Sequence, residues 1–423
     1  MKIIKLGEIA KIDISNVDKK VKEADSPVIL CNFVDVYHNW AITNDLLPNL
    51  MKSTANINQI SRFSIHKGQV AITKDSETRD DIGVSTYIAD NLPNGVLGYH
   101  CALITPDENL LTGKYLNVVL HTPYAQKYFE LNASGSGQRY TLTVDIIAGF
   151  PVPVPDIKTQ HIVGDFYSAI DKKLSTNNRI NTELESMAKT IYDYWFTQFD
   201  FPDENGKPYK SSGGKMVWNE ELKREIPEEW ERVLLKDIEN NIVTGKTPST
   251  KCPEYYNGDI PFITIGDIRG NTYIVSTEQK LSKTGADTQL KKYIPNNSLC
   301  VSCIASPGLI GFATTDSQTN QQINSIIFSN ENNKFFLYFA LNDFFSNSRG
   351  AKTGNTFDNM NKEEFSNIIM IYSSDIVSLF HKKVEPIFNM IRKNSVENQQ
   401  LASLRDWLLP MLMNGQVRFK VVE

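Results

Sequence analysis

The feature that most constrains the fold is a long helical pattern that occurs twice. Residues 162–195 (IVGDFYSAIDKKLSTNNRINTELESMAKTIYDYW) and residues 379–412 (LFHKKVEPIFNMIRKNSVENQQLASLRDWLLPML) align after a shift of 217 positions. The shift places Asn177 on Asn394 and Asn181 on Asn398. We interpret the match as the duplication of one unit, and an internal repeat of this kind decides the plan of a whole chain.

Apolar residues in the first copy recur in alternating steps of four and three. They stand at positions 163, 167, 170, 174, 184, 188, 191 and 195, and Asn177 and Asn181 fill the two central positions of the same series. This alternation is the heptad pattern of a coiled coil. Because each helix alone would leave its apolar stripe in water, we expect the two helices to pair.

The asparagines predict how the helices pair. In an antiparallel arrangement about the two centres, Asn177 meets Asn398 and Asn181 meets Asn394. Buried amides that hydrogen-bond each other satisfy their polar groups, whereas a shifted register would place them against leucines. The alternative, which the sequence leaves open, is that these asparagines lie at solvated edges of the helix pair.

The stretches that precede the two helices also resemble one another. They open with KLGEIAKI and LLKDIENN, continue with an apolar strand ending in Asp (PVILCNFVDV and IPFITIGDI), and close with a Gly-rich polar loop and a strand. We therefore predict an α+β fold in which two pseudo-repeated α/β domains are joined by two long helices forming an antiparallel coiled coil. The expected boundaries are residues 1–155 and 226–373 for the domains, 156–198 and 374–423 for the helices, and 199–225 for a linker rich in Gly, Pro, Ser and charge.

Composition limits the functional classes. The chain has 423 residues, 41% of them hydrophobic, and no apolar run approaches the roughly 20 residues that span a bilayer, so we expect a cytoplasmic protein without a membrane segment. Cys300 and Cys303 lack the further ligands of a structural zinc site. The net charge of −5 argues against a free-standing nucleic-acid binder, so DNA affinity would have to come from a local face or from partners.

One short motif suggests nucleotide hydrolysis. Gly245-Lys246-Thr247 matches the last three residues of a phosphate-binding loop, but Asn240 stands where that loop has its first glycine. Pro248 also opposes the helix whose N-terminus would face the phosphate. We favour a turn between two strands.

Two further stretches carry a resemblance to a known family. TGKTPSTKCPEYYNGDIPFITIGDI (residues 244–268) resembles the opening of a target recognition domain in the specificity subunits of type I restriction-modification systems. Residues 180–230 resemble the central conserved region of these subunits. With the duplicated layout, the likeness extends over nearly the whole chain. It departs from the family at PVPVPDIKTQ, where a Glu-Gln pair often follows the Pro-rich strand, and at IYSSDIVS, which lacks that signal.

The resemblance implies a non-catalytic subunit. Each target recognition domain would read one half of a bipartite, asymmetric target in double-stranded DNA, and the helices would dock two modification (methyltransferase) subunits, which restriction (endonuclease/translocase) subunits join. S-adenosylmethionine, ATP and Mg²⁺ would be used by these partners and none by this chain. In agreement, the sequence has no Asn-Pro-Pro-Tyr or Asp-Pro-Pro-Tyr stretch to hold an adenine. A protein-binding coiled-coil scaffold and a stand-alone nucleotide hydrolase remain the competing classes.

Reading DNA requires donors and acceptors at base edges, together with cations and small polar groups at phosphates. Loops at matching places in the two domains supply such side chains, and we expect neither a catalytic nor a metal site. The candidates in the first domain are Lys74, Arg79, Ser134, Ser136, Gln138, Arg139 and Tyr140. Those in the second domain are Lys246, Thr247, Ser249, Arg349, Lys352, Thr353, Asn355 and Thr356.

Overall fold

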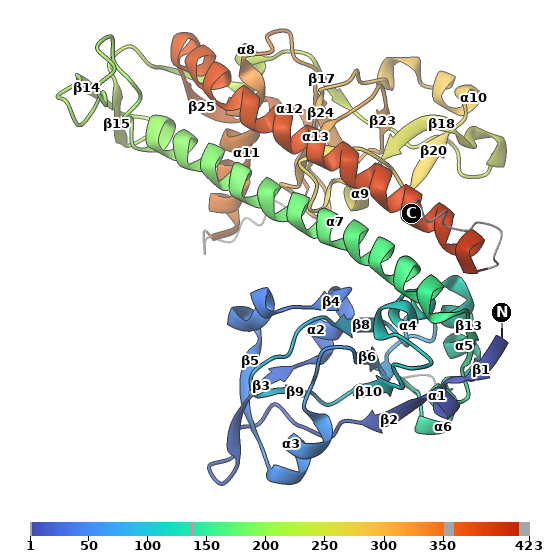
Figure 1. Cartoon of the computed structure of the whole chain (residues 1–423). Coiled ribbons are helices and arrows are strands. Elements are labelled where there is room, and N and C mark those ends of the chain that lie inside the picture. The colour runs from blue at the N-terminus through green and yellow to red at the C-terminus, as the bar shows by residue number, and fades with distance from the viewer. Residues whose placement is uncertain (1, 136–138, 351–358, 414–423) are drawn as a thin grey trace, which may run out of the picture. The chain divides into compact units, whose positions relative to one another are not determined.

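The computed structural model describes residues 2–135, 139–350 and 359–413, which form two compact units. The first unit contains the chain up to Leu174 and the segment that starts at Leu401, and the second contains Ser175–Gln400. Two long helices, α7 (Ile157–Tyr192) and α13 (Ser374–Met413), contribute to both units (Figure 1). Each unit is an α/β structure.

A five-stranded sheet forms the centre of the first unit. Its strands, in spatial order, are β2 (Ala10–Ile14), β10 (Cys101–Pro106), β6 (Val70–Thr73), β8 (Ser85–Ile88) and β4 (Ala41–Ile42). Neighbouring strands are antiparallel except β4 and β8, which are parallel. Helix α4 (Gly113–Leu120) packs against β6 and β8, whose residues are all buried.

The second unit repeats this topology strand for strand. Its five-stranded sheet has the order β17 (Ile242–Thr244), β24 (Ile323–Ile326), β21 (Leu299–Ser302), β22 (Ile310–Ala313) and β19 (Tyr273–Ile274). Here too, three neighbouring pairs are antiparallel and the last pair is parallel. The weak sequence similarity between the two segments therefore corresponds to a duplicated fold.

A smaller three-stranded sheet is duplicated as well. Its orders are β5 (Met51–Ala55), β3 (Ser26–Cys31), β9 (Gly95–Leu97) in the first unit and β20 (Gln279–Leu281), β18 (Tyr256–Ile263), β23 (Gln318–Thr319) in the second. The central strand is antiparallel to the first neighbour and parallel to the second in both sheets.

The aspartates expected to end the apolar strands lie instead in short helices. Helices α2 (Phe33–His38) and α9 (Ile265–Ile268) follow the central strands β3 and β18. Asp35 accepts a hydrogen bond from the Asn32 N–H at 2.7 Å, and Asp267 accepts one from the Thr264 N–H at 2.8 Å. Each aspartate thus completes a capping box that starts its helix.

Each unit is closed by an antiparallel pair of strands just before its long helix. Strand β1 (Lys2–Lys5) pairs with β13 (Pro151–Val154), and β16 (Glu231–Leu234) pairs with β25 (Ile369–Tyr372). Further α-helices are α1 (Leu6–Ile9), α3 (Ile57–Phe63), α5 (Pro123–Asn132), α6 (Val144–Ala148), α8 (Leu235–Ile238), α10 (Lys283–Asp287), α11 (Asn333–Gly350) and α12 (Lys362–Ser366).

The segment expected to be a linker contributes to the core of the second unit. After a π-helical turn (Asp193–Thr197), it forms the hairpin of β14 (Met216–Asn219) and β15 (Arg224–Pro227). Phe201 is buried and stacks on Trp230 with 5.2 Å between the ring centroids. The Gly, Pro and charged residues form turns between a few buried aromatic residues. Because the turn-forming residues dominate the composition, composition alone predicts a linker here.

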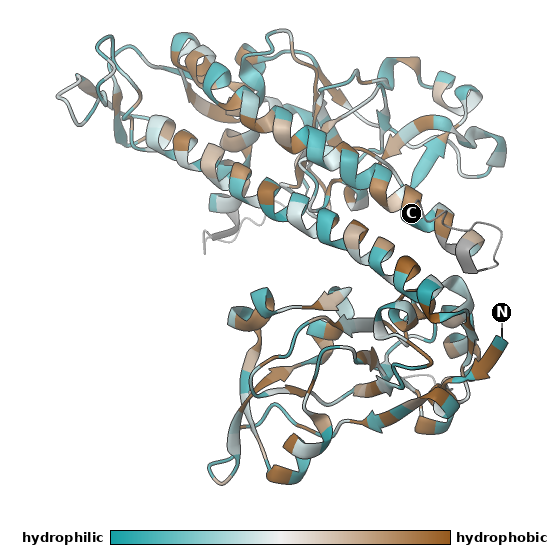
Figure 2. Cartoon of the chain, viewed as in Figure 1, coloured by the Kyte–Doolittle hydropathy of each residue, from teal (hydrophilic) through white to brown (hydrophobic). Residues whose placement is uncertain are grey.

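The two long helices pair in the predicted antiparallel register. The Asn177 amide donates to Asn398 Oδ1 at 2.9 Å, and the Asn394 amide donates to Asn181 Oδ1 at 2.9 Å. Asn177 and Asn394 are buried, while their partners are half-buried, so the layer lies partly at the solvated edge. Figure 2 shows apolar and polar residues alternating along both helices, as a heptad pattern requires.

A glutamine in the first turn of α7 connects this helix to the preceding α/β structure. Gln160 is fully buried. Its amide donates to the carbonyl oxygens of Leu110 at 2.9 Å and Pro155 at 3.0 Å, and its side-chain oxygen accepts the Thr112 N–H at 2.9 Å. Gln160 thereby joins the first turn of α7 to the N-cap of α4.

Candidate nucleic-acid interface

A small sheet in the first unit gathers five of the seven residues predicted there. It consists of β11 (Ser134–Gly135), β12 (Tyr140–Thr141) and β7 (Asp75–Ser76). The five residues on or beside this sheet are Lys74, Arg79, Ser134, Arg139 and Tyr140. Ser136 and Gln138 lie outside the described residues.

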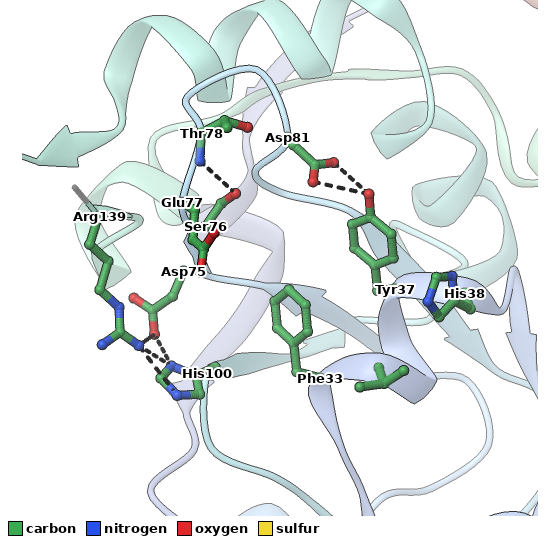
Figure 3. Close-up of a pocket in the computed structure, with 11 residues that line it drawn as sticks. Phe33, Tyr37, His38, Asp75, Ser76, Glu77, Thr78, Asp81, His100 and Arg139 are labelled. Atoms are coloured by element: carbon green, nitrogen blue, oxygen red, sulfur yellow. Dashed lines mark hydrogen bonds and ion pairs between the residues drawn. The ribbon is translucent and has the colours of Figure 1, made fainter. Parts of the chain in front are cut away.

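Asp75, which the sequence did not single out, holds this site together. Its buried carboxylate accepts hydrogen bonds from Lys74 Nζ at 2.7 Å and from the Thr141 hydroxyl at 2.6 Å. Its Oδ2 atom also lies 2.6 Å from His100 Nδ1 and 3.7 Å from Arg139 Nη2 (Figure 3). Burial alone would raise the pKa of Asp75, but the hydrogen bonds from Lys74, Thr141 and His100 outweigh it and lower the pKa below its usual value. We call Asp75 and its four neighbours Lys74, His100, Arg139 and Thr141 the Asp75 cluster.

His100 connects the carboxylate to the guanidinium. Its Nδ1 lies 2.6 Å from Asp75 Oδ2 and 2.7 Å from Arg139 Nη2. A ring nitrogen can donate to the carboxylate or accept from the guanidinium, and the position of the proton on the ring decides which bond forms. When the ring nitrogen donates to the carboxylate, Arg139 Nη2 is still held by its ion pair with Asp75 at 3.7 Å, and the Arg139 side chain is 58% exposed.

A pocket of about 690 Å³ opens beside the Asp75 cluster. Asp75, His100 and Arg139 line it together with aromatic residues of α2. Phe33 stacks on Tyr37 at 5.8 Å between centroids, and the Tyr37 hydroxyl donates to Asp81 at 2.9 Å. The pocket therefore offers cationic donors, carboxylate acceptors and aromatic faces, the three chemistries that recognise nucleic-acid bases.

The other predicted cation of this site is held beside an aromatic ring. The guanidinium of Arg79 lies 5.1 Å from the centroid of the Tyr140 ring, which allows a cation–π contact. Ser134 donates from its hydroxyl to the Thr141 carbonyl at 3.2 Å, so this side chain supports the small sheet.

In the second unit, the Gly-Lys-Thr motif is a turn packed against the segment between β23 and β24. A Cβ on Gly245 would lie 2.2 Å from the Asn320 carbonyl oxygen, so only glycine fits this close approach. The Lys246 N–H donates to Thr319 O at 2.9 Å and the Thr247 hydroxyl to Gln321 Oε1 at 2.6 Å. The motif therefore makes a strand-to-strand turn.

The structure places three of the eight predicted residues of the second unit on this turn. Lys246 and Ser249 are exposed, while Thr247 is half-buried. Lys352, Thr353, Asn355 and Thr356 lie outside the described residues. Arg349 belongs to α11, but its side chain is not among those described.

Among the residues that the structure describes, no group of three or more His, Cys, Asp and Glu side chains is arranged to hold a metal ion. Burial raises the pKa of the Cys300 thiol to about 12 and that of Cys303 to about 11, as is typical of core thiols. In the described part of the chain, no helix combines the length and apolarity needed to cross a membrane.

The sequence model of the type I restriction modification DNA specificity domain matches residues 1–186 and 227–374. This chain is a member of that family. As in the family, it is a non-catalytic subunit that gives a type I restriction-modification system its DNA specificity. The predicted family, function and fold of two α/β units with paired long helices are confirmed.

Individual relatives agree with this assignment. The specificity subunit is 31% identical to the type I restriction enzyme HindI specificity subunit of Haemophilus influenzae, over 89% of this chain and 93% of that protein. It is 23% identical to the MjaIX specificity subunit of Methanocaldococcus jannaschii, over 74% of this chain and 71% of that protein. The crystal structure of an S subunit from M. genitalium has the same fold, with a TM-score of 0.58 at 13% identity, covering 97% of this chain and 95% of that chain.

Proposed function

We propose that this specificity subunit reads a bipartite, asymmetric target in double-stranded DNA, with one half-site for each α/β unit. The observation that supports this proposal is the strand-for-strand duplication of the topology with different side chains at the loops. Two units with the same topology place their loops at equivalent positions. Different side chains on those loops then recognise different bases. Lys74, Arg79 and Arg139 supply cations in the first unit, and Lys246 does so in the second.

The long helices are proposed to dock two modification subunits, which restriction subunits join. In support, large apolar side chains remain exposed on α7 and α13. They include Met187 (55% exposed), Met390 (48%), Leu404 (40%) and Trp407 (60%). S-adenosylmethionine, ATP and Mg²⁺ would be bound by these partners, and the complex would act in the cytoplasm, where its DNA lies.

Selection from a random duplex library tests the proposal. The specificity subunit in complex with the modification subunits of its own system should enrich two short sequence blocks with a constant spacer. A single contiguous block, or no block, would contradict bipartite reading. Lys246→Ala should weaken selection in one block and leave the other unchanged, because the substitution alters only the turn of the second unit.

The competing scaffold function predicts a different response to salt. Contacts to DNA phosphates release counterions, so the logarithm of the binding constant should fall by about 0.9 per phosphate contact for each tenfold rise in salt. We expect this slope for the complex on random duplex DNA, and poorer binding by the isolated subunit, whose net charge is −5. Binding of the complex that does not respond to salt would favour the scaffold.

A further inference from the structure

The two units differ at one position that the duplicated topology allows us to match. In the first unit, the Lys74 N–H donates to His100 O and the Leu142 N–H to Lys74 O. In the second, the Cys303 N–H donates to Gln322 O and the Met360 N–H to Cys303 O. The isolated bridge of Ile304 with Asn359 then matches the pair of Asp75 with Thr141.

Among the residues that the structure describes, charged side chains at this matched position occur in the first unit alone. Ile304 stands where the first unit has Asp75, and Gln322 stands where it has His100. The second unit keeps the same strand pairing around these residues. The fold therefore does not require the Asp75 cluster. We attribute the cluster instead to the ligand that the first unit recognises.

Of the three nitrogen-bearing side chains around Asp75, Arg139 is the one presented to a ligand. Its side chain is 58% exposed, against 27% for His100 and 13% for Lys74. Lys74 turns back onto Asp75 and lies 5.7 Å from the centroid of the Tyr99 ring. Arg139 uses Nη2 toward His100 and Asp75, which leaves further N–H groups of the guanidinium at the mouth of the pocket (Figure 3).

We propose that Asp75 is a positioning residue that fixes Arg139 so that Arg139 reads a guanine in the half-site of the first unit. This inference rests on the proposed function of that unit as the reader of one half-site. Guanine presents two acceptors, O6 and N7, in the major groove, and the planar fork of arginine matches them. A guanidinium already held at one nitrogen loses less conformational freedom on binding than a mobile one.

The test compares the base preferences of complexes that contain the full subunit and its modification subunits. The substitution Arg139→Lys preserves the charge but removes the fork, so we expect a guanine preference at one position to fall by roughly 5- to 150-fold, the discrimination of one bidentate contact. Asp75→Asn should reduce the preference at the same position, because the amide no longer anchors the guanidinium by charge. Neither variant should alter the second sequence block, which serves as an internal control.

Two further variants separate positioning from folding. The double variant Asp75→Ile, His100→Gln carries the residues that the second unit tolerates at this position, so it should fold and still lose the guanine preference. Asp13→Asn is the matched control, because it removes a buried carboxylate that accepts from Arg62 Nη2 at 2.9 Å and does not line the pocket; it should leave the preference at that position unchanged. Thermal unfolding of each complex confirms that the variants are folded.

Several results would overturn the inference. Arg139→Lys without effect on either block excludes Arg139 as a reader, and an altered position that does not prefer guanine excludes the base. Folded Asp75→Asn with full guanine preference excludes the positioning role, as does an equal loss in both blocks. Failure of the proposed function is distinguishable from these results. In that case the wild-type complex itself would select no sequence in either block, which would refute the proposed function and this inference with it.

Discussion

Glu185, on α7, is a half-buried carboxyl group that contacts Thr272 of the second unit. It accepts a hydrogen bond from the Thr272 hydroxyl, whose oxygen lies 3.5 Å from the Tyr338 hydroxyl. Burial raises the pKa of Glu185 above its usual value, although the bond from Thr272 acts in the opposite direction. A carboxyl group with a raised pKa contributes stability below its unfolded pKa and loses this contribution as the pH rises through the folded pKa.

We therefore expect Glu185→Gln to raise the melting temperature at neutral pH. The glutamine oxygen can still accept the Thr272 bond, while no charge has to be buried. The gain should shrink as the pH falls to about 4, where the wild-type glutamate is itself protonated. Thermal unfolding between these two pH values provides the measurement, and a gain that stays constant with pH would show that the charge of Glu185 is not its cause.

The residues of the candidate interface were only partly predictable. Lys74, Arg139 and Tyr140 were predicted because they stand in polar loops, where base contacts commonly arise. Asp75 and His100 were missed, since they are 25 positions apart and meet only through the pairing of β6 with β10. No local pattern encodes a carboxylate that gathers its partners across a sheet.

The paired helices are the element that the sequence determines best. The heptad spacing predicts the two helices. The four asparagines predict their antiparallel direction and register, because the amide pairs are hydrogen-bonded in only one alignment. A contact outside the asparagine layer agrees with this direction, because the Tyr167 hydroxyl of α7 donates to the Arg405 carbonyl oxygen of α13 at 3.1 Å. The π-helical turn after Tyr192 was not predicted, since aromatic packing rather than spacing determines it.

Substitution of the asparagine layer tests its contribution to the helix pair. Asn177→Leu should cost roughly 1–3 kcal/mol of unfolding free energy, because the Asn398 amide then faces a leucine. The double variant Asn177→Leu, Asn398→Leu should recover part of this loss, since two leucines pack together and the exposed Asn178 can bond to water. Denaturant unfolding of both single variants and the double variant gives the coupling; purely additive losses would mean that the two amides do not depend on each other.

The turn at Gly245 allows a matched pair of glycine substitutions. In Gly245→Ala, the new Cβ would have to push away Asn320 O, only 2.2 Å distant, so we expect a loss of roughly 1–3 kcal/mol and weaker selection of one half-site. In Gly266→Ala, the nearest atom is Thr264 Oγ1 at 3.7 Å, so the new methyl group meets ordinary contact distances and should be tolerated. Equal stability of the two variants, measured by denaturant unfolding, would contradict the tight approach at Gly245.

At the scale of the whole molecule, the duplicated plan was predictable and the strand order was not. Matching openings, strands and loops indicated two similar domains. The order β2-β10-β6-β8-β4 joins strands that are far apart in the chain, and alternating apolar residues do not identify such partners. The aromatic packing of Phe201 on Trp230 was likewise hidden by the turn-rich composition around it.

The length of the helix pair is expected to set the spacing between half-sites. Inserting one heptad into both helices, near Asn181 and Asn398, preserves the seam and adds about 10 Å. This corresponds to about three base pairs at ~3.4 Å each. The extended subunit, in its complex, should either select a longer spacer or lose specific binding, because the groove also rotates with the added base pairs. Undiminished affinity for the original spacer, with the helices shown to be folded by circular dichroism, would refute the prediction.

The strand pairs that close the units have a consequence for inheritance. Lys2 lies opposite Val154 and Leu234 opposite Ile369, so the chain enters and leaves each α/β unit through neighbouring strands. Replacement of everything between such a pair leaves the path into the next helix unaltered. Genetic exchange with breakpoints in these strands can therefore deliver a complete new DNA preference in one event, as a cassette, without waiting for single substitutions to accumulate.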